Sequence, residues 1–254
     1  MLQYKESGRG KILVLVHGFC ESNVIWKNFQ SQLSEKYHVI CPDLPGFGKS
    51  PLKVKDIGIA YYAEMLKELL SFLDVEQCCM IGHSLGGYVT LAFAEKYPAM
   101  LNSFGLFNST AFADSTEKKD SRNKTIQFIE KHGVEMFAQS FVAPLFYAEN
   151  RTRLKEEIGL MTSIAGASSK EGVIEATKAM RDRQDRVSVL KNTSLPVLFI
   201  IGKEDTAVPI EKSLEQCYLP ADSTVYFIKG VGHMGMLEAE EKTMKMIDAF
   251  LNRI

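Results

Sequence analysis

Gly82, Ser84 and Gly86 stand at two-residue spacing where the chain passes from an apolar run to a helical pattern. The run that ends at Ile81 is typical of a short buried strand, and residues 89–96 are typical of a helix. A strand-to-helix turn this tight leaves no room for a side chain at either glycine, and it projects the serine hydroxyl above the strand end. Gly-x-Ser-x-Gly alone also occurs by chance, but this context makes Ser84 a candidate nucleophile.

The rest of the chain alternates between strand and helix patterns. Strands are predicted at 4–7, 11–16, 37–41, 101–108, 195–201 and 224–228, and helices at 24–33, 57–73, 211–217 and 236–251. Such alternation favours right-handed crossovers between parallel strands, with helices on both faces of the sheet. The predicted fold class is therefore α/β, with a mainly parallel, doubly wound sheet.

Residues 113–186 interrupt this alternation, because the strand pattern disappears there. Four helices are predicted instead, over 115–131, 134–141, 151–164 and 170–182. We expect this block to be an all-helical cap, or lid, inserted into a core made of residues 1–112 and 187–254. The alternative is that these helices simply cover the surface of the core.

Composition excludes several classes of protein. The 254 residues are enough for one large domain with a sizeable core. Thirty Lys and Arg against 31 Asp and Glu leave a net charge of −1, which gives no strong field for nucleic acid or an anionic membrane. Five scattered cysteines show neither metal-ligand nor disulfide spacing, and no apolar run has the length of a signal peptide or membrane span. We expect a cytoplasmic protein without nucleic-acid or membrane partners; its oligomeric state stays open.

A serine nucleophile needs a base, and histidine is the natural candidate because it exchanges a proton near neutral pH. His233 lies in a glycine-rich loop after the last predicted strand, where the strand ends gather. The other histidines are better explained structurally: His17, His38, His83 and His132.

The base in turn needs a carboxylate to orient it. Asp205 follows the preceding strand, where its loop turns into a helix, and we favour it for this position. Glu204, one residue away, is the competitor, and we expect it to be a solvated neighbour.

The order Ser84, Asp205, His233 is that of a nucleophile-elbow hydrolase. The sequence resembles the α/β-hydrolase superfamily, in its cap-bearing, serine esterase-like branch, over essentially the whole chain. The stretches that carry the resemblance are 17–19, 43–50, 82–87, 202–205 and 232–233.

The resemblance implies an oxyanion hole made by the backbone N–H groups of Phe19 and Leu85. His17, Gly18 and the 43–50 loop are interpreted as structural, with Asp43 bonding local backbone amides.

The expected chemistry is hydrolysis of small or medium carboxylic esters, or thioesters, through an acyl-enzyme on Ser84, without a metal or organic cofactor. The small-molecule substrate would lie between sheet and cap. Candidate pocket walls are Phe19, Phe112, Phe141, Phe146 and Met234.

Other activities on the same scaffold stay open. Carbon–carbon bond hydrolases and lyases keep the serine, although the lyases usually show an arginine where this chain has Tyr88. Dehalogenases and epoxide hydrolases use aspartate as the nucleophile, which Ser84 argues against. A different class is also open: a ligand-sensing protein that keeps the triad to signal to a partner.

Overall fold

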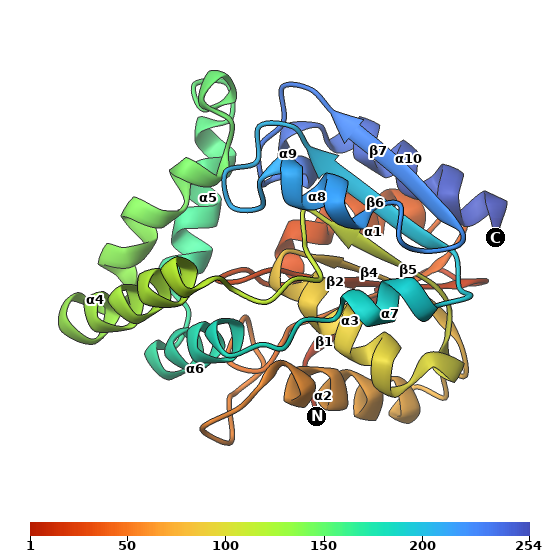
Figure 1. Ribbon diagram of the computed structural model, residues 1–254, viewed down its shortest axis with the longest axis horizontal. Helices are drawn as coiled ribbons and strands as arrows, with labels where there is room; N and C mark the ends of the chain where they lie inside the picture. The colour runs from red at the N-terminus through yellow and green to blue at the C-terminus, as the bar shows by residue number, and fades with distance from the viewer.

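A seven-stranded sheet forms the centre of the computed structural model, which describes residues 1–254 (Figure 1). Its strands, in spatial order, are β1 (Tyr4–Ser7), β3 (His38–Pro42), β2 (Ile12–Val16), β4 (Cys78–His83), β5 (Leu101–Phe107), β6 (Val197–Gly202) and β7 (Ser223–Ile228). Only β1 pairs antiparallel, and every other neighbouring pair is parallel. The predicted α/β class and mainly parallel sheet are therefore confirmed.

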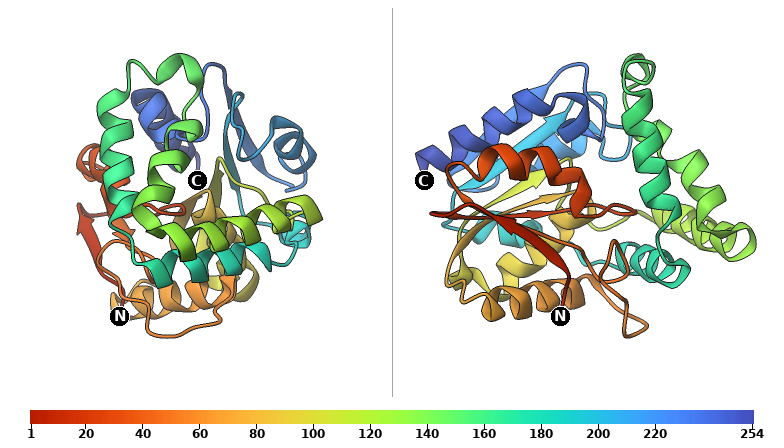
Figure 2. Two further views of the ribbon diagram at one scale, coloured as in Figure 1. Left: turned by 90° about the vertical axis from the view of Figure 1, so that its left-hand side faces the viewer. Right: turned by 180° about the vertical axis from the view of Figure 1, so that it is seen from behind.

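Helices cover both faces of this sheet, as the continuous apolar strands require. One face carries α1 (Lys27–Leu33) and α10 (Glu240–Arg253), and the other carries α2 (Ile59–Phe72), α3 (Leu85–Lys96), α7 (Val187–Asn192) and α8 (Ile210–Gln216) (Figures 1 and 2). All six residues of β4 are buried, as are all six of β6, and β4 is the fourth of the seven strands in the sheet. The loop after β4 therefore emerges from the middle of the sheet.

Apart from shifts of a few residues at element ends, the structure differs from the prediction in three elements. The helix predicted at 236–251 is two helices, α9 (Gly235–Glu238) and α10, because Ala239 leaves the helical conformation at φ −142° and ψ 49°. The helix predicted at 24–33 begins with a 3₁₀ turn, η1 (Asn23–Trp26), which the Ser22 side chain caps. Helix α7 was not predicted, since six residues are too short for a clear pattern.

Residues 113–186 are helical, as expected. They form α4 (Thr116–Phe141), η3 (Ala143–Leu145), η4 (Ala148–Asn150), α5 (Lys155–Gly166) and α6 (Lys170–Arg181). Gly133, at φ 83° and ψ 168°, breaks α4 into the two helices that the sequence predicted. The block lies beyond the carboxyl ends of the strands, and α4 packs against both α5 and α6 (Figure 1).

Two further features of the chain bear on its class. All five cysteines are free and buried, as the sequence indicated. Burial raises the pKa of the Cys79 thiol to about 12, which makes it a poor nucleophile. None of the helices combines the length and apolarity that a membrane crossing needs.

Candidate active site

Ser84 occupies a strained turn between β4 and α3. Its backbone lies at φ 50° and ψ −115°, which is unfavourable for a residue with a Cβ. A Cβ on Gly82 would lie 2.1 Å from the Gly86 carbonyl oxygen, and one on Gly86 would lie 2.4 Å from that of Val16. Both glycines are therefore required by close approach, as predicted, and Ser84 is left half-buried at the end of the strand.

Asp205 and His233 form a buried hydrogen-bonded pair. The His233 Nδ1–H donates to Asp205 Oδ2 over 2.7 Å, and the two residues are 3% and 5% exposed. The same carboxylate accepts from Asn108 Nδ2 at 2.7 Å and from the Val208 N–H at 3.0 Å. Burial alone would raise the pKa of Asp205, but His233 and these hydrogen bonds hold that pKa below its ordinary value. In a neutral imidazole, the hydrogen bond from Nδ1–H to this carboxylate leaves Nε2 as the accepting nitrogen.

His83 joins the serine turn to the histidine loop. Its Nε2–H donates to the His233 carbonyl oxygen at 2.9 Å, and the two rings lie 4.9 Å apart. The backbone N–H of Ser84 is anchored to the Phe107 carbonyl on β5. The ends of β4, β6 and β7 therefore bring Ser84, Asp205 and His233 to one edge of the sheet.

Glu204 does not face His233. It is half-buried, and its Oε2 accepts the backbone N–H groups of Gly230 and Val231 at 2.8 and 3.0 Å. The expectation that Glu204 is only a solvated neighbour is therefore wrong, because its carboxylate supports the histidine loop. The hydrogen bond to His233 belongs to Asp205 alone.

Phe19 lies in the loop after β2, three residues beyond Val16, with its backbone N–H free of any protein hydrogen bond. The N–H of Leu85 opens helix α3, where no preceding turn can accept it. The ring of Phe19 packs against Phe141 of α4 with centroids 5.6 Å apart, and Phe141 stacks on Phe137 at 4.8 Å. An aromatic contact thus connects the loop after β2 with the helical block.

The residues interpreted as structural do bond backbone groups. The Asp43 carboxylate accepts the N–H groups of Asn23 at 2.7 Å and Lys49 at 2.9 Å, as predicted. His17 Nε2 accepts the Leu44 N–H at 2.9 Å. These contacts hold the loop after β3.

The five candidate pocket residues separate into two groups. Phe146 and Met234 are 1% and 0% exposed and belong to the hydrophobic core. Phe141 is half-buried beside Phe19, and Phe112 lines a cavity of about 230 Å³ next to residues 206–209.

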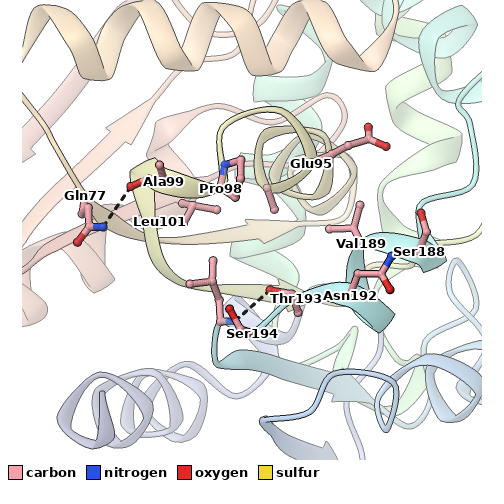
Figure 3. A pocket seen from close by; sticks show the side chains of 12 residues that line it. Gln77, Glu95, Pro98, Ala99, Leu101, Ser188, Val189, Asn192, Thr193 and Ser194 are labelled. Carbon is pink, nitrogen blue, oxygen red and sulfur yellow. Dashed lines mark hydrogen bonds between the residues drawn. The ribbon is translucent and has the colours of Figure 1, made fainter.

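A larger cavity, of about 570 Å³, lies at the opposite end of helix α3 (Figure 3). Gln77, Leu101 and Leu195 in its wall stand at or just before the starts of β4, β5 and β6. It contains none of the candidate site residues, so its position at the amino ends of the strands separates it from the Ser84 turn.

The structure adds residues that sequence reasoning missed. Asn108 directly follows β5, and its position at a strand end could have drawn attention to it. Phe137 stands one helical turn before Phe141, which the predicted helix would have placed on the same face. Glu21 bonds His83 and Glu238 bonds Tyr147, both far away in the chain, and no local sequence pattern predicts these contacts.

Comparison with known proteins agrees with this architecture. Residues 11–240 match the family model described as the alpha/beta hydrolase fold. An esterase from Thermogutta terrifontis, in a malate-bound structure, superposes with a TM-score of 0.95 at 28% identity, over 99% of this chain and 93% of that one.

Sequence relatives carry varied names. A 2-hydroxy-6-oxononadienedioate/2-hydroxy-6-oxononatrienedioate hydrolase from Pseudomonas is 24% identical over 99% of this chain and 92% of its own length. An uncharacterized protein of Mycobacterium tuberculosis is 35% identical over 99 residues, which is 39% of this chain and 29% of that relative. The match over residues 11–240 and the seven-stranded sheet together show that this chain belongs to the α/β-hydrolase family.

Proposed function

We propose that this chain is a serine hydrolase that cleaves small or medium carboxylic esters through an acyl-enzyme on Ser84. The observation that carries the proposal is the buried 2.7 Å bond from His233 Nδ1–H to Asp205, next to a serine held in a strained turn. This arrangement fixes the imidazole tautomer that can accept the serine proton.

The proposed reaction runs in two halves. His233 Nε2 takes the proton from the Ser84 hydroxyl, whose oxygen attacks the ester carbonyl, and the N–H groups of Phe19 and Leu85 hold the oxyanion. When the tetrahedral intermediate collapses, the alcohol leaves with the proton from His233. Water, deprotonated by the same imidazole, then releases the acid and restores Ser84.

The acyl group would lie against Phe19, Phe137 and Phe141, between the sheet and residues 113–186, which we infer to act as a cap. These three rings pack edge-to-face or stacked, with centroid distances from 4.8 to 6.3 Å. Aromatic walls favour an apolar acyl group over a charged one. The esterase name of the Thermogutta neighbour is consistent with this choice.

Hydrolysis of p-nitrophenyl esters from acetate to decanoate tests the proposal. We expect the turnover rate to be highest for short or medium acyl chains, which fill the space beside the rings of Phe19, Phe137 and Phe141. The variant Ser84→Ala should lose about 10⁴-fold or more in kcat. Equal rates for the wild type and this variant would show that the measured hydrolysis does not use Ser84 and would remove the proposal.

A second candidate, hydrolysis of a carbon–carbon bond in an anionic substrate, is favoured by the charges around the 230 Å³ cavity. Its wall includes Lys118, Arg183 and Lys212, and the Arg183 guanidinium lies 4.1 Å from the Tyr88 ring centroid. Arg183 pairs with Asp114, which also lines the cavity, and Lys212 pairs with Glu215. Lys118 pairs with no carboxylate and leaves the wall with an excess of positive charge. Such an excess of positive charge attracts carboxylates.

The two candidates are separated by a comparison of substrates. If the chain acts on an anionic dienoate, kcat/KM for 2-hydroxy-6-oxo-2,4-heptadienoate should exceed that for p-nitrophenyl butyrate. Lys118→Met should then lower kcat/KM for the dienoate by about 5- to 10-fold, since a lost charge contact costs roughly 1 kcal/mol. The ester, which is neutral, serves as the matched control. Faster turnover of the ester and no effect of Lys118→Met would leave ester hydrolysis as the function.

A further inference from the structure

No backbone N–H group of the loop that carries His233 donates a hydrogen bond to another residue of the same loop. Residues 230–234 offer five successive backbone N–H groups, and each of them is bound by an acceptor outside the loop. The acceptors are Glu204 Oε2 for Gly230 and Val231, Glu238 Oε1 for Gly232 (3.0 Å) and Met234 (3.2 Å), and the Leu145 carbonyl for His233 (2.8 Å). The position of His233 therefore depends on two carboxylates and on the helical block.

Glu238 is the residue that connects these supports. It is 6% exposed, and while its Oε1 holds the amides on both sides of His233, its Oε2 accepts the Tyr147 N–H at 2.9 Å and Asn150 Nδ2 at 2.8 Å. Both of these donors belong to the segment 145–150, between η3 and the end of η4. One buried side chain thus holds the histidine loop and the helical block together.

Gly232 allows this close approach. A Cβ at this position would lie 2.7 Å from the Tyr147 nitrogen and 2.8 Å from the Leu145 carbonyl oxygen, so any other residue would push the segment 145–150 away. Asn150 adds a second connection, because its Nδ2 also donates to the Gly230 carbonyl oxygen at 2.8 Å. Leu145, Tyr147 and Asn150 therefore all bond either the histidine loop or Glu238.

We propose that Glu238 is a positioning residue that fixes His233 and couples it to the segment 145–150 of the helical block. The inference rests on the proposed serine hydrolysis, in which His233 is the base. His233 is then held in place partly by the helical block that would cover the substrate. A change in this block therefore alters the reactivity of Ser84 as well as access to it.

Glu238→Gln tests this with little change of shape. A glutamine has one accepting oxygen, so its NH₂ group must face two of the four N–H donors that the carboxylate now accepts. Buried donors left without a partner cost more than a lost surface contact and loosen the loop. Because displacement of a catalytic group by about 1 Å can cost 100-fold in rate, we expect the reaction of Ser84 to slow by roughly 10- to 100-fold.

The measurement is the rate constant for covalent labelling of Ser84 by a small fluorophosphonate, followed by intact mass and expressed per folded molecule. Labelling needs the base and the oxyanion donors, and it does not depend on the fit of an acyl group. Glu240→Gln is the matched control, because the carboxylate of this half-buried glutamate bonds only Asn28 and no N–H group of the loop. We expect wild-type labelling from the control, and KM for p-nitrophenyl butyrate within twofold of wild type in Glu238→Gln.

A double-mutant cycle with Asn150→Ala tests the coupling to the helical block. Asn150→Ala alone should slow labelling by about 3- to 10-fold. The double variant should be labelled no more slowly than Glu238→Gln, since both substitutions disrupt the same connection between the loop and the helical block. Multiplicative losses would overturn the coupling, and labelling of Glu238→Gln at the wild-type rate would overturn the positioning role. A wild-type protein that is not labelled at Ser84, yet hydrolyses esters, would overturn both the proposed function and this inference.

Discussion

Asp205→Asn is expected to lower kcat for ester hydrolysis by about four orders of magnitude with little change in fold. The carboxylate now accepts the Nδ1–H of His233 and keeps Nε2 free for the serine proton. An asparagine that turns its NH₂ group towards His233 stabilises the opposite tautomer, in which Nε2 carries the proton and cannot act as a base. The measurement is kcat for p-nitrophenyl butyrate, with circular dichroism as the check on folding.

Glu204→Gln is the matched control for this prediction, since it makes the same chemical change one residue earlier. Its side chain keeps an oxygen that can accept the N–H groups of Gly230 and Val231. We expect a loss of less than about 10-fold, because the orientation of His233 is disturbed only through its loop. A larger loss for Glu204→Gln than for Asp205→Asn would show that the orienting carboxylate is Glu204.

The sheet and the site at its edge could be predicted because each left a local pattern. Strands buried on both faces give continuous apolar runs, as β2 and β4 do, and the two glycines around Ser84 mark a turn that excludes side chains. The gap predicted between the helices 115–131 and 134–141 likewise contains Gly133, which breaks α4. In parallel sheets, loops after neighbouring strands meet at one edge, so Asp205 and His233 could be placed together from their positions alone.

The supports behind the site could not be predicted, because they are single contacts between residues far apart in the chain. Glu21 is 62 residues away from His83, and Glu238 is 91 residues away from Tyr147. The residues next to such a buried glutamate in the sequence do not distinguish it from a glutamate on the surface. For this reason Glu204 was expected to be solvated, although it holds two backbone amides.

Glu21 and His83 form a buried hydrogen-bonded pair at the serine turn. His83 Nδ1–H donates to Glu21 Oε2 at 3.1 Å, and the same oxygen accepts the Gly18 N–H, just before Phe19. Burial lowers the pKa of His83, but the Glu21 carboxylate outweighs it and raises that pKa above 6.5. Burial raises the pKa of Glu21, but His83 outweighs it and holds that pKa below 4.5. The pair thus links the loop after β2, the serine turn and the His233 carbonyl.

Glu21→Gln should lower the free energy of unfolding by on the order of 3 kcal/mol near pH 5.5, because it leaves a buried imidazolium without its counter-charge. The raised pKa of His83 contributes stability in full below pH 6.5, and this contribution is lost as the pH rises through its folded-state pKa. The lowered pKa of Glu21 contributes above pH 4.5, and this contribution is lost as the pH falls. The difference between wild type and variant should therefore be largest between pH 4.5 and 6.5 and smaller at pH 9.

Glu6→Gln provides the comparison that isolates burial, because Glu6 also pairs with a histidine, His38, at 2.9 Å. That pair lies at the surface, with side chains 40% and 27% exposed. Thermal unfolding of both variants should show a fall in Tm of roughly 5–10 °C for Glu21→Gln at pH 5.5 and of about 2 °C or less for Glu6→Gln. If the two shifts are equal, or if that of Glu21→Gln does not shrink at pH 9, then the Glu21–His83 pair is not charged. The two loops would then be held by the hydrogen bonds from His83 and Gly18 alone.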